Sequence, residues 1–358
     1  MFDFELQKSS DELVKVIFGV KERETVVLTA DTSSCKPVLD AIASSVYAAG
    51  AIPMVITCAT PRGVGKAADL DLPIESMVGA LMGADVWIEL NKQWLLYSTV
   101  FERVEADHRQ LRYMNLVEFN EDMLIRTVGQ VNTRELRNFM YRVAEKTRNT
   151  KLMHIENAAG TDVCFEIEPS HVVSCDCGDA TEPGFHMLSG QINVVPRFGT
   201  IQGTIVFDGC LTPPFGRILK EPVHLSIENS RIIRIDGGVD ARRFEKWLYS
   251  FNDEGMLKMA HVAYGFNPGA KLTGNIVEDE RVWGCTEWGI GYVSPYDAPP
   301  NGQQAKSHCD GICIDSSVWL DGYQIMDEGV IVDEELRALS PIKMPFVPFL
   351  NVSSEKCC

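Results

Sequence analysis

The sequence predicts an α/β fold in which a Rossmann-like parallel-sheet domain precedes a mixed, mostly antiparallel α+β domain. Before residue 150, apolar runs typical of buried strands alternate with helical segments, which favours a parallel sheet with helices on both faces. From Lys151 onward, short β-rich runs are separated by turn residues, which favours antiparallel pairing. The chain has 358 residues, more than one core usually takes, so we expect domains at residues 1–150 and 151–358.

The front domain is expected to alternate strands and helices. A helix at about residues 9–18 comes first, and strands are expected at residues 25–30, 52–58, 86–90 and 111–117. Helices are expected at residues 38–49, 74–82 and 98–106, and from about residue 121. The loop after the first strand, residues 31–37 (DTSSCKP), has no glycine to admit a pyrophosphate, so we expect no bound nucleotide.

The rear domain follows a long charged helix expected at residues 134–148, which suits a connector. Its expected strands lie at residues 152–155, 163–167, 192–195, 203–208, 223–228 and 232–236. A helix at residues 244–250 precedes residues 258–264, a segment that carries His261. We expect this second domain to bind the metal and to be catalytic.

The composition excludes several classes of partner and site. A net charge of −17 disfavours nucleic acid and anionic membrane surfaces as partners. No apolar run reaches the length of a membrane span, and the N-terminus MFDFELQKSSDEL lacks the basic region and apolar core of a signal peptide, so we expect a cytoplasmic protein. The eleven cysteines include no CxxC pair, which argues against a zinc ribbon.

The spacing of His308 and Asp310 points to a metal ion. Side chains two residues apart in an extended segment share one face, so this imidazole and this carboxylate can reach the same ion. A third ligand, His261, Glu287 or a carboxylate of residues 278–280, would complete the set. Two histidines and one carboxylate leave coordination positions open, as non-haem Fe(II) oxygenases require. The alternative is a histidine that is simply hydrogen-bonded to a nearby aspartate.

Glu182 and His186 lie in a second candidate segment, residues 182–186 (EPGFH), which predicts a loop. Loops often carry such residues without any chemical role. The remaining histidines are expected to be structural or solvated; they are His108, His154, His171 and His224.

Several segments of the rear domain together resemble the aminopeptidase T superfamily. They are residues 265–274 (GFNPGAKLTG), 278–281 (EDER), 307–311 (SHCDG) and 318–322 (VWLDG). The resemblance is strongest over about residues 180–330. This superfamily includes peptidases with two bridged metal ions and 2,5-dihydroxypyridine dioxygenases with one non-haem iron.

The departures from the peptidase pattern favour the dioxygenases. The peptidases carry glutamates where this chain has Gln191 and His261, and a histidine where it has Glu287. An amide replaces a bridging carboxylate poorly, because the charge that balances two dications is lost. The dioxygenases use a histidine at the position of His261 together with the pair His308 and Asp310. The resemblance therefore implies one Fe(II) on these three residues.

The resemblance also implies roles for residues around the ion and a class of substrate. His186 is the first candidate for the base, with Glu182 orienting it or binding the ring nitrogen. Arg281 matches an arginine of the dioxygenase pocket and would hold an anionic oxygen; the alternative is a structural ion pair. Glu287 would be either an outer group or a fourth ligand of the ion. Tyr97 stands where the dioxygenases carry a histidine, so the substrate can differ.

Three functional hypotheses follow. The first is a homo-oligomeric Fe(II) dioxygenase that opens a hydroxylated heteroaromatic ring, such as 2,5-dihydroxypyridine, with O₂. The second is a metal-dependent aminopeptidase or amidohydrolase with Glu287 as general base and a metal-bound water as nucleophile. The third is a binding protein that kept the fold and lost the metal. The metal content per chain distinguishes them: one iron supports the first hypothesis, two zinc or cobalt ions the second, and no metal the third.

Overall fold

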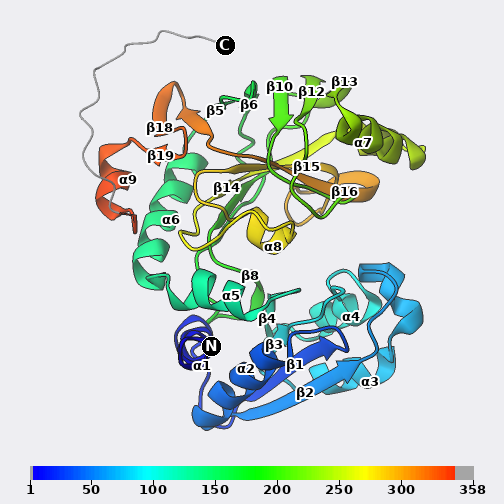
Figure 1. Cartoon of the computed structure of the whole chain (residues 1–358), viewed down its shortest axis with the longest axis vertical. Coiled ribbons are helices and arrows are strands. Elements are labelled where there is room, and N and C mark those ends of the chain that lie inside the picture. Colours follow the sequence, from blue (N-terminus) through cyan, green and yellow to red (C-terminus); the bar gives the residue numbers. More distant parts are fainter. Residues whose placement is uncertain (1–2, 343–358) are drawn as a thin grey trace. The chain divides into compact units, whose positions relative to one another are not determined.

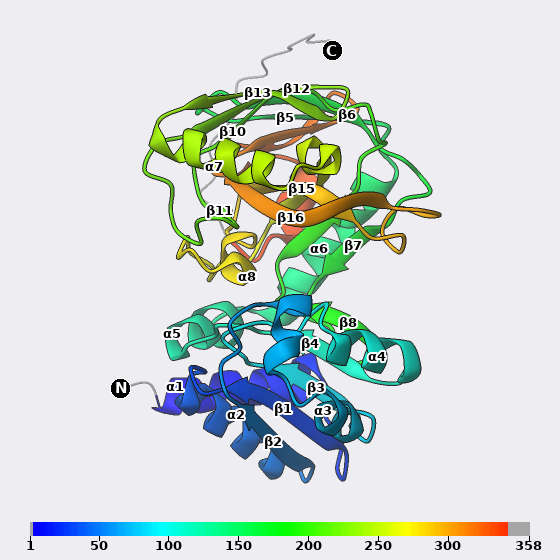
Figure 2. The same cartoon turned by 90° about the vertical axis from the view of Figure 1, so that its right-hand side faces the viewer.

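The computed structural model describes residues 3–342, and the chain forms two compact units (Figures 1 and 2). Unit 1 comprises the chain up to Thr133 together with Asp176–Ser189. Unit 2 comprises Arg134–Cys175 and the chain from Gly190 onward. This division differs from the expected boundary at residue 150 in two ways. The long helix at residues 134–148 belongs to unit 2, and unit 1 also includes the later segment Asp176–Ser189.

Unit 1 is built on a five-stranded parallel sheet in the order β2-β1-β3-β4-β8. Its strands are β1 (Thr25–Asp31), β2 (Ile52–Cys58), β3 (Val86–Glu89), β4 (Arg112–Asn115) and β8 (Gly184–Met187). Four of these strands lie where the sequence predicts them. The fifth, β8, was expected to be a loop, and it forms the sheet edge beside β4.

Unit 1 also contains helices, which precede or follow the strands β1 to β4. They are α1 (Asp3–Asp11), α2 (Lys36–Ala48), α3 (Ile74–Leu81), α4 (Thr99–Asp107) and α5 (Glu121–Leu124), with the π-helical segments η1 (Glu12–Ile17) and η3 (Ile125–Gly129) and the 3-10 helix η2 (Gly65–Asp71). Ser98 caps α4 by accepting a hydrogen bond from the Phe101 N–H, and Asn120 caps α5 through the Met123 N–H.

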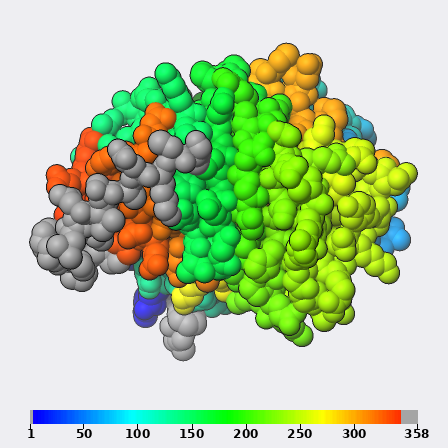
Figure 3. Space-filling model, turned by 90° about the horizontal axis from the view of Figure 1, so that it is seen from above, coloured from blue at the N-terminus to red at the C-terminus, as the bar shows by residue number. Residues whose placement is uncertain are grey.

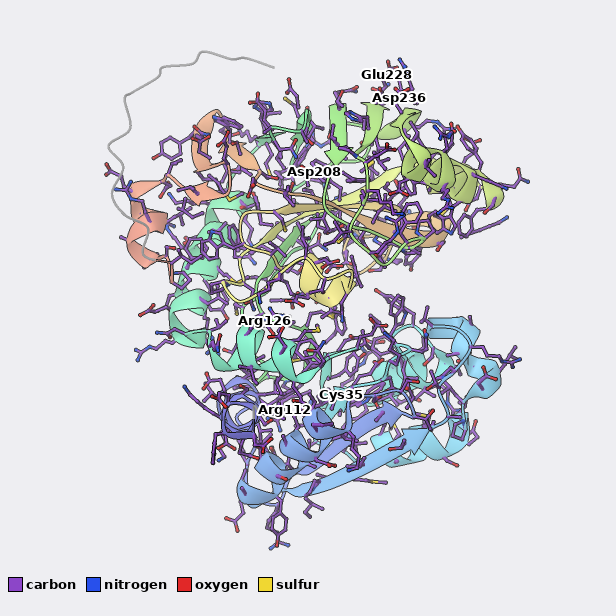
Figure 4. The ribbon with its side chains drawn as sticks, viewed as in Figure 1. Cys35, Arg112, Arg126, Asp208, Glu228 and Asp236 are labelled. Atoms are coloured by element: carbon purple, nitrogen blue, oxygen red, sulfur yellow. The ribbon has the colours of Figure 1, made fainter. Side chains whose placement is uncertain are left out.

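Two charged side chains, Arg112 and Glu89, are buried in the interior of unit 1. The guanidinium of Arg112 on β4, labelled in Figure 4, pairs with Glu24 at 2.6 Å and donates to the carbonyl oxygen of Phe18 at 2.7 Å. The fully buried Glu89 at the end of β3 accepts hydrogen bonds from the Tyr113 hydroxyl and the Leu95 N–H. These buried groups are therefore partnered, as burial of charge requires.

Unit 2 contains an eight-stranded and a six-stranded sheet, so the mixed α/β fold class predicted from the sequence is confirmed. The first sheet consists of β13 (Arg231–Gly237), β12 (Val223–Glu228), β10 (Gln202–Phe207), β6 (Asp162–Glu166), β5 (Leu152–Glu156), β17 (Ser317–Leu320), β18 (Tyr323–Asp327) and β19 (Val330–Ile331). The second consists of β11 (Leu211–Thr212), β16 (Gln303–Cys313), β15 (Thr286–Val293), β14 (Met259–Gly265), β9 (Gln191–Val194) and β7 (Val173–Asp176).

The two sheets of unit 2 pack through large apolar side chains. Phe165 of the first sheet meets Trp288 of the second edge to face, with ring centroids 5.7 Å apart. The ring of Phe207 packs over Gly311, where an added Cβ would lie 2.4 Å from that ring. A glycine one residue after Asp310 therefore lets the sheets approach closely where the candidate metal ligands begin.

Helices complete unit 2. They are α6 (Thr133–Arg148), α7 (Val239–Ser250), α8 (Ile276–Asp279) and α9 (Glu334–Leu339), with the turn η4 (Glu254–Leu257). The yellow-green region of Figure 3 is the surface over β12, β13 and α7. Among residues 3–342, no helix combines the length and apolar character needed to cross a membrane.

Candidate metal centre

Three neighbouring antiparallel strands of unit 2 carry the candidate site. In the second sheet, β15 lies between β14 and β16. The register places Gly289 of β15 opposite Asp310, and Gly291 opposite His308. His308 and Asp310 are two residues apart on β16, so their side chains share one face of the sheet.

The side chains of His261, His308 and Asp310 converge at this face. His308 Nε2 lies 2.8 Å from Asp310 Oδ1, and His261 Nε2 lies 3.6 Å from the same oxygen. The two imidazole rings stack, with centroids 5.0 Å apart and planes inclined by 24°. Each residue offers one ligand atom within 4.8 Å of the others. The structure therefore brings together the three residues proposed as ligands from the sequence.

Glu287 on β15 is a fourth member of this group. Its side chain is 0% exposed, and its carboxylate oxygens lie 3.0 and 3.1 Å from His261 Nε2. It is also hydrogen-bonded to Asp310. Because two adjacent buried carboxyl groups do not both ionise readily, this contact is a shared proton between them.

Gly289 makes room for the ring of His261. A Cβ at this position would lie 2.5 Å from His261 Cε1 and within 2.8 Å of both ring nitrogens. Any larger residue at position 289 would displace the imidazole of His261. Sequence reasoning missed Gly289, because only the strand register shows which side chain a glycine accommodates.

His308 is oriented by its second ring nitrogen. Nδ1 lies 2.7 Å from the carbonyl oxygen of Tyr292, which can only accept, so Nδ1 carries a proton and donates it. Nε2 is thereby directed at Asp310. Metal-binding histidines are commonly held in this way, with one nitrogen fixed by a carbonyl group and the other free for the ion.

Burial and neighbouring charges set the protonation of the group. Burial, reinforced by the nearby His308, lowers the pKa of His261 to about 4, so this imidazole is neutral at neutral pH. Burial works against ionisation of Asp310, but the charge of His308 outweighs it and holds the pKa of Asp310 below its ordinary value. Burial, together with the charge of Asp310, raises the pKa of Glu287 well above its ordinary value. The site thus contains one ionised and one protonated carboxyl group.

This donor set fits a divalent transition-metal ion. Two imidazole nitrogens and one carboxylate are the ligands of non-haem Fe(II) oxygenases. Donor atoms about 2.1 Å from one ion and at right angles to each other lie about 3 Å apart. The separations of 2.8 and 3.6 Å around Asp310 Oδ1 bracket that value. The neutral His261 and the ionised Asp310 supply the lone pair and the negative charge that an ion needs.

Arg281 lies inside a hydrogen-bonded network close to this group. Its side chain is 0% exposed, and Nη1 donates to Glu280 Oε2 and to the Val277 carbonyl oxygen, each at 2.8 Å. Nη2 donates to Gln191 Oε1 at 2.8 Å, and Gln191 Nε2 donates to Glu280 Oε2 at 3.0 Å. Arg281 therefore forms an ion pair with Glu280, which is one of the two interpretations of this residue from the sequence.

The other candidate residues, Tyr97, Glu182 and His186, lie in unit 1. Tyr97 immediately precedes the cap of α4, with φ of 64° and a side chain that is 58% exposed. His186 lies on β8, and its Nε2 is 2.9 Å from the carbonyl oxygen of Glu182. The rings of Tyr97 and Phe185 both contact Phe101, with centroids 6.0 and 6.2 Å from it. Tyr97 and β8 therefore meet at one aromatic cluster of unit 1.

A second group of potential ligands lies on β5 and β6. His154 Nε2 is 2.9 Å from Asp162 and 3.2 Å from Glu156, and its ring stacks on Trp319. Asp162 is largely exposed. This is the hydrogen-bonded structural histidine that the sequence predicts at residue 154.

A family model and one curated relative carry the same description. A family model described as 2,5-dihydroxypyridine 5,6-dioxygenase matches residues 12–333. A 2,5-dihydroxypyridine 5,6-dioxygenase of Pseudomonas putida KT2440 is 27% identical over 201 residues, which cover 53% of this chain and 57% of the relative. The chain thus spans little more than half the length of that curated relative.

Two solved structures have the same fold. The 2,5-dihydroxypyridine dioxygenase of Pseudomonas putida KT2440 has a TM-score of 0.76 and 19% sequence identity, and the match covers 93% of this chain and 99% of that chain. AmpT from Thermus thermophilus has a TM-score of 0.70 and 13% identity, with 93% and 100% covered. At these identities the likenesses bear on the fold alone.

Proposed function

The chain belongs to the 2,5-dihydroxypyridine 5,6-dioxygenase family, and from this premise we propose that it is a mononuclear non-haem Fe(II) dioxygenase. Its reaction opens the ring of a dihydroxylated N-heterocycle, such as 2,5-dihydroxypyridine, with O₂. The observation that carries the proposal is the convergence of His261, His308 and Asp310 on one face of the sheet. Two imidazoles and one carboxylate leave room on an ion for both a substrate and O₂.

His261, His308 and Asp310 would hold the iron. When bound, Fe(II) supplies the redox chemistry by which an electron-rich ring reacts with O₂. The protein prepares these ligands through its own hydrogen bonds. The Tyr292 carbonyl oxygen fixes the ring of His308. Glu287 lies against Asp310 and against His261 Nε2, the nitrogen that faces Asp310, so it would stand beside the ion as a fourth ligand or an outer group.

The remaining roles concern the substrate. His186 is our candidate for the base that removes a proton from the ring, because the ordinary pKa of histidine lies near neutrality. The backbone carbonyl of Glu182 contacts the imidazole of His186 and fits the orienting role proposed for this residue. The exposed Tyr97 would donate a hydrogen bond to an oxygen of the substrate or of O₂. Arg281 would act through the Glu280 side chain that it holds.

The main alternative is a metal-dependent aminopeptidase of the aminopeptidase T type. The environment of Gln191 argues against it. This residue stands where the peptidases carry a ligand carboxylate, and its amide is engaged with Glu280 and Arg281. The amide nitrogen donates and has no lone pair for a second ion.

Metal reconstitution followed by O₂ uptake tests the proposal. The protein is loaded anaerobically with Fe(II), its iron content is measured, and O₂ consumption is followed with 2,5-dihydroxypyridine and related dihydroxy rings. We expect one iron per chain and ring-dependent uptake. In the His308→Ala variant, iron affinity should fall by at least about 10-fold, because even outer-shell losses cost that much. Release of an amino acid from a peptide, without O₂ uptake on any ring, would support the peptidase instead.

We further propose that the enzyme is a cytoplasmic homo-oligomer whose partners are the ring substrate and O₂. Light scattering coupled to gel filtration tests the oligomeric state, and a monomeric mass under conditions of full activity would contradict it. The net charge of −17 supports the absence of nucleic acid and membrane partners.

A further inference from the structure

Glu280 is a carboxylate near the metal centre to which the proposed mechanism assigns no chemical step. It directly follows α8, and one of its oxygens, Oε2, accepts hydrogen bonds from Arg281 Nη1 at 2.8 Å and Gln191 Nε2 at 3.0 Å. The other oxygen, Oε1, accepts no hydrogen bond from the residues that the structure describes. The side chain is 13% exposed, and Oε1 is held in place through its partner oxygen.

The residues that hold Glu280 are buried and hydrogen-bonded. Arg281 is 0% exposed and is itself anchored by the Val277 carbonyl oxygen. Gln191 is 8% exposed and lies on β9, which pairs with the strand that carries His261. A carboxylate fixed through one oxygen by two such donors is oriented before any ligand arrives, which is how binding and catalytic groups are preorganised.

The metal centre lies within the electrostatic reach of Glu280. Its negative charge raises the pKa values of His308 and Glu287, and the charge of Asp310 acts on Glu280 in return. Burial raises the pKa of Glu280, Arg281 lowers it and Asp310 raises it further, to about 7. A carboxyl group titrating near neutrality exchanges protons readily under working conditions.

We propose that Glu280 is a second catalytic residue, which receives a proton from the ring substrate through Oε1. This inference rests on the proposed function. A dihydroxylated N-heterocycle carries two exchangeable protons on its oxygens or ring nitrogen, and one base removes only one of them. In the step assigned to Glu280, an O–H or N–H bond of the ring breaks, an Oε1–H bond forms, and the electron pair stays on the ring. Gln191 and Arg281 are positioning residues for this transfer.

The test is the Glu280→Gln variant of the full chain, loaded anaerobically with Fe(II). The amide keeps the volume of the side chain, and its oxygen still accepts from Arg281 and Gln191, but it takes up no proton. We expect iron content and secondary structure to match the wild type. We expect kcat to fall by about 100-fold, the lower range for the loss of a general base. Glu334→Gln, at an exposed position of α9, is the matched control and should leave kcat unchanged.

A readout without turnover separates proton transfer from a structural role. The absorption spectrum of 2,5-dihydroxypyridine depends on its ionisation, so anaerobic binding at pH 7.5 reports whether the bound ring has lost its proton. The wild type should bind the anionic ring, and Glu280→Gln should bind it with an additional proton. The limb of the kcat/KM profile near pH 7 should also disappear in the variant.

Two results would overturn the inference while the proposed function stands. One is an active wild type alongside a Glu280→Gln variant with unchanged kcat, pH profile and bound-ring spectrum. The other is loss of iron from the variant, which would make Glu280 part of the metal site rather than a proton acceptor. A wild type that consumes no O₂ with any ring would instead remove the proposed function itself.

Discussion

Glu89 is a buried carboxyl group whose titration should be visible in the stability of the whole chain. It lies at the end of β3, fully buried, and accepts from the Tyr113 hydroxyl and the Leu95 N–H. Burial raises the pKa of Glu89 from its ordinary value of 4.5 to about 7, although these hydrogen bonds act in the opposite direction. The perturbation is the Glu89→Gln substitution, which resembles the protonated acid in shape and removes the titration.

The magnitude and sign follow from linkage. A folded-state pKa above the unfolded value gives stability that is fully present below pH 4.5 and is lost as the pH rises through 7. At roughly 1.4 kcal/mol for each tenfold change in proton affinity, the displacement of the pKa of Glu89 corresponds to about 3 kcal/mol. The wild type should therefore lose about 3 kcal/mol relative to Glu89→Gln between pH 4.5 and pH 8.

Urea unfolding of both proteins, followed by circular dichroism at a series of pH values, measures this difference. Glu5→Gln, on the exposed face of α1, is the control and should give a difference in unfolding free energy that does not vary with pH. A difference between wild type and Glu89→Gln that stays constant from pH 4.5 to pH 8 would refute the reasoning. It would mean that Glu89 ionises as readily in the folded chain as in the unfolded one.

Two further predictions follow from close packing and from buried charge. Gly289→Ala should push the ring of His261 aside, since the new Cβ would lie 2.5 Å from Cε1, and iron affinity measured by competition with a chelator should fall at least about 10-fold. Gly79→Ala on α3, where an added Cβ meets nothing within 4 Å, is its control and should bind iron normally. Arg112→Met breaks the ion pair with Glu24 and should lower the free energy of unfolding by about 3 kcal/mol. A loss below about 1 kcal/mol in urea titrations would contradict the importance of that pair.

The regular elements could be predicted because their apolar patterns are local. The strand expected at residues 52–58 matches β2 (Ile52–Cys58), and that at 223–228 matches β12 (Val223–Glu228). In contrast, β8 could not be predicted from the sequence, because it is a strand only through its pairing with β4. A Pro-Gly pair opens the segment, and the first two residues of the strand, Gly184 and Phe185, are both exposed, so no alternation marks the strand.

In the candidate site too, some residues could be predicted from the local sequence and others could not. The spacing of His308 and Asp310 on one extended segment could be read directly, and the structure places their side chains 2.8 Å apart. His261 was proposed as the third ligand through the family resemblance, since nothing local links it to β16. The roles of Gly289 and Glu280 depend on which atoms face them across strands and turns. Such contacts are a property of the register rather than of the sequence near either residue.

The return of Asp176–Ser189 to unit 1 has a consequence for how the chain folds as it is synthesised. About 70 residues separate the end of β4 from the start of β8, so at about 5–20 residues per second the ribosome needs roughly 3 to 14 seconds to deliver the last strand. During that interval the outer edge of β4 has no strand partner, and an open edge invites pairing with another nascent chain. Slower translation of residues 116–183 would lengthen this exposure, and faster translation would shorten it.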